Sequence, residues 1–135
     1  MTKITKNPTT QLGMATEIPS SPHDAKLDRI KNPHTDKNYV ARFTCPEFTS
    51  LCPVTGQPDF ATIEIKYIPN LLIVELKSLK LYLQGFRNVG VFHEDVANKI
   101  LDDIRFVCNP RKIDVVGRFN PRGGISTIVE VGWLE

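Results

Sequence analysis

Two consecutive stretches with helical periodicity occupy the centre of the chain, and they constrain the fold more than any other feature. Apolar residues recur three or four positions apart between residues 75 and 88: Leu79, Tyr82, Leu83 and Phe86. Ser78 is a suitable N-cap for this first helix. The second helix is expected to begin near residue 92 or 93 and to end at about residue 107, before Asn109-Pro110. Because only a short turn separates the two helices, they are expected to pack antiparallel.

Strand-like stretches flank this helical pair on both sides. Apolar and polar residues alternate over residues 37–44 and 60–67 before it, and over residues 113–118 and 125–133 after it. Residues 120–124, Asn-Pro-Arg-Gly-Gly, are interpreted as the turn of the second pair. The order strand, strand, helix, helix, strand, strand favours an α+β fold over a doubly wound parallel sheet.

The remaining composition limits the classes of function. Residues 1–36 show no sustained periodicity, and we interpret them as a flexible arm before a single domain that spans residues 37–135. A formal net charge of +2 is too small to predict binding to nucleic acid or to a membrane surface. No apolar run resembles a signal sequence or a membrane span. Three cysteines are an odd number, so we expect free thiols and a reducing cytoplasm rather than a disulfide framework.

Residues 45–59, CPEFTSLCPVTGQPD, are interpreted as a long connection between the first two strands. Its three prolines restrict the backbone and give the connection a preset shape. Cys52 and Asp59 therefore place a sulfur nucleophile and an acid/base carboxyl on one stiffened segment. The alternative is that Cys52 is a small buried apolar residue, as free cysteines commonly are.

Three other groups of residues carry chemistry, and each also has a structural explanation. Glu94 complements the positive end of the second helix, or it binds the amidine-like edge of a base through paired hydrogen bonds. Lys77 and Lys80 share one helix face. Either this face is solvated, or the two lysines, together with Arg122 and the following glycines, hold a phosphorylated cofactor. Glu75 is either a capping residue or part of a site. The isolated histidines at positions 23 and 34 make a poor metal site.

Four motifs together resemble the 7-cyano-7-deazaguanine reductases, the NADPH-dependent nitrile reductases of queuosine biosynthesis. The motifs are CPEFTSLCPVTGQPD (45–59), ELKSLKLYLQGFR (75–87), FHED (92–95) and PRGGIS (121–126). The resemblance implies the tunnelling fold, an antiparallel four-stranded sheet with two antiparallel helices on one face. It also implies a homo-oligomer, a pentamer or a decamer, with active sites at subunit interfaces, and no direct binding to nucleic acid or membrane.

The same resemblance implies a role for each matched residue. Cys52 would attack the nitrile carbon and form a covalent thioimide, while Asp59 would donate protons. NADPH would deliver two hydrides in succession and give the aminomethyl product. The substrate would be bound by Val74, Glu75, Leu76, His93 and Glu94, and the NADPH by Lys77, Lys80, Arg122 and Gly123. No metal is implied.

Two alternatives are kept open. The first is another tunnelling-fold enzyme, such as a zinc-dependent hydrolase related to GTP cyclohydrolase. For this alternative the three cysteines lack a convincing histidine partner or the spacing of a zinc site. The second is a binding module that keeps the Glu94 pocket without catalysis, although both Cys52 and Asp59 are present.

Overall fold

A computed structural model describes Pro22 and residues 26–135 of the chain. The elements follow in the order β1 (Arg29–Lys31), β2 (Ala41–Leu51), β3 (Pro58–Ile68), β4 (Leu72–Val74), α1 (Leu76–Gln84), α2 (His93–Cys108), β5 (Lys112–Arg122) and β6 (Ile125–Leu134). Most of the arm expected over residues 1–36, including His23, lies outside the described residues. Within them, no helix is both long and apolar enough to span a bilayer.

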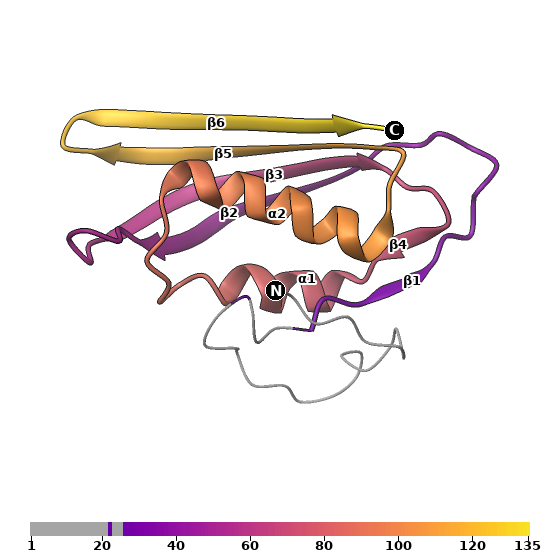
Figure 1. Ribbon diagram of the computed structural model, residues 1–135, viewed down its shortest axis with the longest axis horizontal. Coiled ribbons are helices and arrows are strands. Elements are labelled where there is room, and N and C mark those ends of the chain that lie inside the picture. Colours follow the sequence, from indigo (N-terminus) through magenta and orange to yellow (C-terminus); the bar gives the residue numbers. More distant parts are fainter. Residues whose placement is uncertain (1–21, 23–25) are drawn as a thin grey trace.

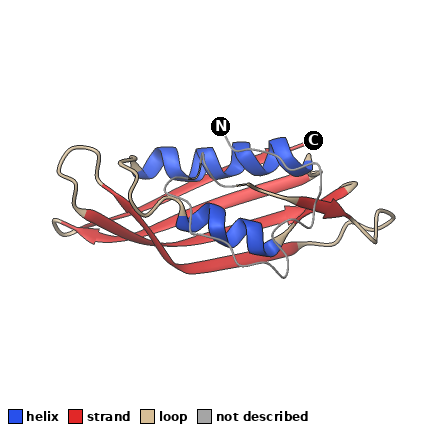
Figure 2. Cartoon of the chain, turned by 90° about the horizontal axis from the view of Figure 1, so that it is seen from below, coloured by secondary structure: helices blue, strands red, loops and turns tan. Residues whose placement is uncertain are grey.

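The four long strands form one antiparallel sheet, in the order β2-β3-β5-β6. Both helices cover the same face of this sheet and run in opposite directions, as Figures 1 and 2 show. Strand β3 illustrates why this face is buried, because its alternate residues are shielded from solvent: Ala61, Ile63, Ile65 and Tyr67. Those side chains meet the apolar stripe of α2, which includes Val96, Ile100 and Ile104. The α+β fold and the antiparallel helical pair are confirmed.

The connection before β3 is much shorter than the sequence indicated. Strand β2 continues through Cys45 to Leu51, and β3 already begins at Pro58, so the connection is residues 52–57. Pro46 lies inside β2, where the register between β2 and β3 shifts between Cys45 and Phe48. A proline is tolerated there because β2 is an edge strand and a bulge does not need every backbone donor. The prediction of a long loop over residues 45–59 is therefore wrong.

Part of the expected arm packs on the domain. Strand β1 pairs with β4, a short apolar stretch for which no element was predicted. Leu27 and Asp28 just before β1 are fully buried, and the Asn32 side chain donates a hydrogen bond to the carbonyl of Asn70 over 2.7 Å. Residues 26–32 thus close one end of the helical layer.

The N-cap of α1 is Glu75 and not Ser78. The Glu75 carboxylate accepts hydrogen bonds from the backbone N–H groups of Lys77 (2.7 Å) and Ser78 (2.9 Å). The Ser78 hydroxyl lies inside the first turn, where it donates to the Glu75 carbonyl (2.7 Å) and accepts from the backbone N–H of Asp28 (2.9 Å). The helix therefore begins three residues earlier than predicted, and its first turn is bonded to the segment before β1. Helix α2 ends as expected, with Asn109 in the left-handed region (φ 45°).

Candidate functional site

Cys52 opens the tight turn between β2 and β3. Its backbone N–H donates to the carbonyl of Gln57 (2.8 Å), and its own carbonyl accepts from the N–H of Gly56 (2.9 Å), which closes the turn. Gly56 has a φ of 73°, a conformation that favours glycine. The thiol is largely shielded, with 7% of the residue exposed.

The polar groups of this turn stabilise the ionised form of Cys52. Hydrogen bonds from the Thr55 side chain, and then from the backbone of Thr55 and Val54, lower the pKa of the thiol to about 7, with a smaller contribution from the Arg122 charge. A thiol with this pKa is about half ionised at neutral pH, and the thiolate is the nucleophilic form. Among the three cysteines Cys52 alone has a lowered pKa, since burial raises the pKa of Cys45 and of Cys108.

Asp59 brings three elements together at the same end of the sheet. It lies at the start of β3, opposite Ser50 of β2, and is only 6% exposed. Arg122, the last residue of β5, donates from Nη1 to both carboxylate oxygens, over 2.9 Å and 3.1 Å. His93, the first residue of α2, places Nε2 3.1 Å from Oδ2. This contact has the distance of an ion pair but not the alignment of a hydrogen bond, so Nε2 has no hydrogen-bond partner in the described part of the chain.

The His93 ring is held by an aromatic stack. It lies parallel to the ring of Phe119, with centroids 3.9 Å apart and an angle of 10° between the planes. Gly117 gives Phe119 its space, because a Cβ at this position would stand 2.9 Å from Phe119 Cε2. The stack fixes the imidazole next to Asp59. No local pattern in the sequence indicates Phe119, because its role depends on the packing of α2 against β5.

Several predicted site residues lie far from Cys52 in the structure. Val74, Glu75 and Leu76 are at the junction of β4 and α1, at the opposite end of the molecule from the β2–β3 turn (Figure 1). Leu76 and Gln84 are separated by the length of α1, about 12 Å at 1.5 Å per residue, and it is the Gln84 end that approaches Cys52. A single chain therefore does not bring residues 74–76 and Cys52 into one pocket.

Glu94 and Glu75 use their carboxylates differently from each other. Glu94 is exposed in the first turn of α2, next to Asp95, where both complement the helix dipole. Glu75 is buried, and both of its carboxylate oxygens cap α1. Within one chain Glu75 therefore caps α1, and Glu94 faces the surface.

The residues predicted to hold a cofactor fall into two separate places. Lys77 and Lys80 lie on α1, whereas Arg122 and Gly123 lie at the β5–β6 turn beside Asp59. Gly123 and Gly124 form that turn with positive φ values of 61° and 81°. The expected clamp of both lysines with Arg122 does not form within one chain, and the pairing of Arg122 with Asp59 depends on the register of β3 and β5, which a local pattern does not reveal.

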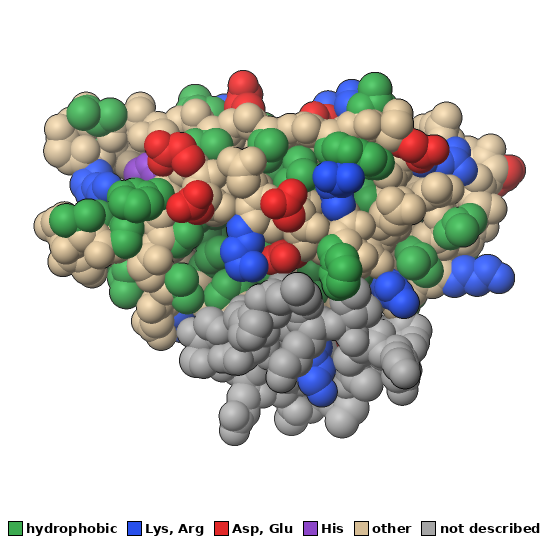
Figure 3. All heavy atoms as spheres, in the orientation of Figure 1, with side chains coloured by type: hydrophobic (Ala, Val, Ile, Leu, Met, Phe, Trp, Pro, Cys, Tyr) green, Lys and Arg blue, Asp and Glu red, His purple; other side chains and the backbone are tan. Residues whose placement is uncertain are grey.

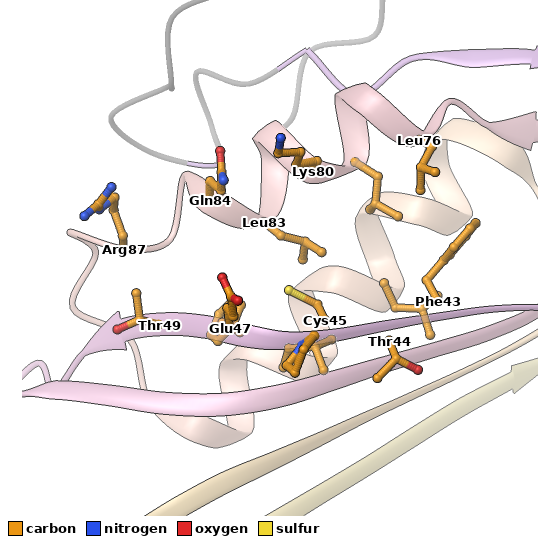
Figure 4. A pocket seen from close by; sticks show the side chains of 15 residues that line it. Phe43, Thr44, Cys45, Glu47, Thr49, Leu76, Lys80, Leu83, Gln84 and Arg87 are labelled. Carbon is orange, nitrogen blue, oxygen red and sulfur yellow. The ribbon is translucent and has the colours of Figure 1, made fainter.

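A cavity of about 530 Å³ lies between β2 and α1 (Figure 4). Lys80 of α1 and Arg87 of the connection after it line the cavity on one side, and Cys45 and Glu47 of β2 line it on the other. In Figure 4 the charged ends of Lys80 and Arg87 point away from β2. Apolar side chains cover the rest of the wall: Phe43, Phe48, Ile63, Ile65, Leu76, Leu79 and Leu83. The cavity thus has a mostly apolar wall with a few polar side chains at its edge. Cys45, Glu47 and Arg87 were not predicted as site residues.

Some of the exposed apolar side chains lie around the Cys52 end. Figure 3 shows hydrophobic side chains on the surface where the β2–β3 and β5–β6 turns lie. Val54, Phe92 and Ile125 expose 79%, 54% and 70% of their surface, respectively.

Within Pro22 and residues 26–135, no group of three or more His, Cys, Asp or Glu side chains is arranged to hold a metal ion.

The sheet and the helical pair define an α+β protein of the tunnelling-fold class. The solved structure of the archaeosine synthase QueF-Like in the apo form is similar, with a TM-score of 0.66 and 20% sequence identity over 71% of this chain and 94% of that chain. At this identity the likeness concerns the fold alone.

The sequence comparisons identify the family. Residues 58–133 match the family described as QueF-like protein. The chain is similar to several proteins named NADPH-dependent 7-cyano-7-deazaguanine reductase. The one from Parvibaculum lavamentivorans has 54% identity over 93% of this chain and 80% of the relative. One in Methylorubrum extorquens has 55% identity over 91% and 79%, and one in Porphyromonas gingivalis 55% over 87% and 76%. The chain belongs to the QueF-like family, which confirms the resemblance found in its motifs.

Proposed function

We propose that this chain reduces the nitrile group of 7-cyano-7-deazaguanine to an aminomethyl group with two molecules of NADPH, in the biosynthesis of queuosine. The proposal is supported chiefly by the placement of Cys52, a thiol whose pKa is about 7, in the turn that leads into the strand bearing the buried carboxyl of Asp59. The names of the relatives support the substrate and the cofactor. The overall reaction adds two hydrides and two protons to the C≡N bond.

The first step uses Cys52 and Asp59. The Cys52 thiolate attacks the nitrile carbon, a C–S bond forms, and one π bond of the nitrile becomes the lone pair that Asp59 protonates on nitrogen. The product is a neutral thioimide with a C=N bond, which accepts a hydride more readily than a nitrile does. The Asp59 carboxyl is held in place by Arg122, whose Nη1 lies 2.9 Å from Oδ1, and by His93, whose Nε2 lies 3.1 Å from Oδ2.

NADPH, when bound, would supply the two hydrides that the reaction requires, one before and one after the C–S bond breaks. Between these events the chain returns the Cys52 sulfur to the thiolate, which the Thr55 and Val54 groups stabilise. Asp59, after taking up a proton from solvent, delivers the second proton to nitrogen. The Ser50 hydroxyl, which is fully buried opposite Asp59, has no partner among the described residues, and together with His93 Nε2 it offers polar contacts to a ligand atom.

The substrate and cofactor residues support a site shared between subunits. We assign the deazaguanine to His93 and Glu94 of one subunit and to Val74, Glu75 and Leu76 of the next, and the NADPH to Lys77, Lys80, Arg122 and Gly123. Residues at opposite ends of one chain meet only if a neighbouring copy brings its α1 to the Cys52 end. The exposed apolar side chains at that end support such contact. We therefore propose a homo-oligomer, a pentamer or a decamer, and the three free cysteines favour a reducing cytoplasm.

The direct test is oxidation of NADPH in the presence of 7-cyano-7-deazaguanine. We expect two NADPH to be consumed for each nitrile, as measured by absorbance together with mass spectrometry of the aminomethyl product. A zinc-dependent hydrolase or a binding module would consume no NADPH. Binding of the nitrile without NADPH consumption, in protein whose thiols are reduced, would contradict the proposal.

Mixed oligomers test whether the site is shared. Cys52→Ala subunits lack the nucleophile, and subunits carrying both Lys77→Ala and Lys80→Ala lack the α1 cations. If each site takes Cys52 from one subunit and the lysines from its neighbour, random assembly of equal amounts restores both parts in about a quarter of the sites. We expect each variant alone to be nearly inactive and the co-refolded mixture to recover about a quarter of the normal turnover.

The control for this experiment is a mixture of the two variants that is never dissociated and refolded, which should stay inactive. Light scattering should show the same oligomer for the refolded mixture and for the unchanged protein. A mixture that assembles normally but recovers no activity would show that all of these residues act within one chain.

A further inference from the structure

The connection between α1 and α2 passes directly beside the residue before the nucleophile. The backbone N–H of Leu51 donates to the carbonyl of Val89 (2.9 Å), and the N–H of Val91 donates to the carbonyl of Leu51 (3.0 Å). These two hydrogen bonds form a parallel bridge between Leu51 and Gly90. Leu51 precedes Cys52, and Gly90 stands three residues before His93. The bridge therefore joins the two segments that carry the thiol and the imidazole.

Gly90 makes a close approach to the Cys52 turn. A Cβ on Gly90 would stand 3.2 Å from Pro53 Cα and 3.5 Å from Pro53 Cβ. The nearer distance is shorter than an ordinary van der Waals contact, and the atom it meets belongs to the backbone. Gly90 is not among the glycines with positive φ. A glycine is thus needed here for space and not for backbone conformation.

Pro53 occupies a sensitive position in the turn. It lies between Cys52 and the two residues, Val54 and Thr55, whose backbone groups hydrogen-bond the sulfur. A proline has a fixed φ, so a displacement of its Cα is passed on to the following amides rather than absorbed by rotation. Hydrogen bonds weaken steeply as their distance and angle depart from the optimum. A shift of a few tenths of an ångström at Pro53 is therefore enough to change how the thiolate is held.

We propose that Gly90 is a positioning residue for Cys52. The α1–α2 connection holds Pro53 so that the Val54 and Thr55 groups remain directed at the sulfur, and it ties the Cys52 turn to the start of α2, where His93 meets Asp59. The proposal rests on the proposed function, in which Cys52 is the nucleophile, but it concerns a part of the chain that contacts neither substrate nor cofactor in that mechanism.

The test is the pH dependence of Cys52 alkylation by iodoacetamide, followed by mass spectrometry of the Cys52 peptide. In the unchanged protein the alkylation rate should have its midpoint at about 7. In Gly90→Ala we expect the midpoint to rise by about one pH unit, which lowers the alkylation rate at pH 7 about fivefold. Nitrile-dependent turnover at pH 7 should fall by at least the same factor.

Gly132→Ala is the matched control. A Cβ on Gly132 would also meet a neighbour, Asp114 Oδ1, but this contact lies on β6 and β5 and involves the end of a side chain. It should leave the alkylation midpoint unchanged. Thermal melting of both variants measures any general loss of stability, which by itself does not move the midpoint of a folded protein.

A second variant reports on the bridge without adding an atom near Pro53. Val91→Pro removes the N–H that donates to the Leu51 carbonyl, and it should raise the midpoint in the same direction. If Gly90→Ala does not fold, Val91→Pro decides the question. An unchanged midpoint in the folded variants would overturn the proposal. A raised midpoint in a protein that forms no nitrile adduct would support it while contradicting the proposed function.

Discussion

Incubation of the protein with 7-cyano-7-deazaguanine, without NADPH, should increase the mass of each chain by one substrate molecule. Cys52→Ala should abolish this adduct and reduce turnover below detection, because no other group replaces the thiolate. The adduct rate should also depend on pH. The pKa of Cys52 is lowered to about 7, so the thiolate is present above this pH and is lost below it. We therefore expect the rate to fall about tenfold per unit below pH 6 and to level off above pH 8.

The other two cysteines serve as controls for this experiment. Cys108 is almost fully buried, and burial raises its pKa to about 12. Burial also raises the pKa of Cys45, which lines the cavity between β2 and α1. Cys45→Ala and Cys108→Ala should therefore form the adduct as the unchanged protein does. An adduct of equal yield in Cys52→Ala would rule out the proposed mechanism.

Asp59→Asn should lower kcat by about 10²- to 10⁴-fold, the range typical of a lost general acid. Asparagine keeps the shape of the side chain but cannot donate the proton that the nitrile nitrogen requires. Arg122 keeps a neutral oxygen as its partner, and about 39% of its side chain is exposed, so its unpaired charge remains partly solvated. Substrate affinity should change only a few-fold. Steady-state kinetics separate kcat from KM, and intact-protein mass spectrometry reports slower adduct formation.

The control for Asp59→Asn is Arg118→Ala. Arg118 also pairs with a carboxylate, Glu64, but this pair is half exposed on β5 and β3, away from Cys52. It should leave kcat unchanged. If Asp59→Asn retained kcat within threefold of the unchanged protein, another group would have to supply the proton.

Much of the fold could be predicted from the sequence because its signals are local. Helical spacing gave α1 and α2 to within a few residues, and alternation gave the inner parts of β3, β5 and β6. The errors arise where the sheet overrides a local rule. Pro46 and Pro58 indicated a loop, yet one lies in an edge strand at a shift in register and the other begins a strand. Ser78 is a good N-cap by type, but Glu75 reaches the same N–H groups from an earlier position.

The structure brings only some of the predicted site residues together within one chain. Asp59 and His93 are in contact, although one lies at the start of a strand and the other at the start of a helix, and Cys52 lies in the turn before that strand. The partnership of Arg122 with Asp59 and the stack of Phe119 on His93 depend on how β5 lies against β3 and α2, which no local pattern contains. Residues 74–76 and Cys52 lie at opposite ends of one chain. Periodicity places residues on elements, and only the family resemblance implies a site that a neighbouring subunit completes.

The bonding of residues 26–32 to the start of α1 has a consequence for how the protein folds. Helix α1 has only nine residues, and isolated helices of this length are marginal in water. Its first turn gains the Asp28–Ser78 hydrogen bond, across 50 positions of sequence, and the pairing of β1 with β4. Contacts between such distant segments form late, because the chain must first pay the entropy of closing the loop. The long hairpins are thus expected to form first, and the α1 surface assigned to NADPH to become ordered only when the N-terminal segment docks.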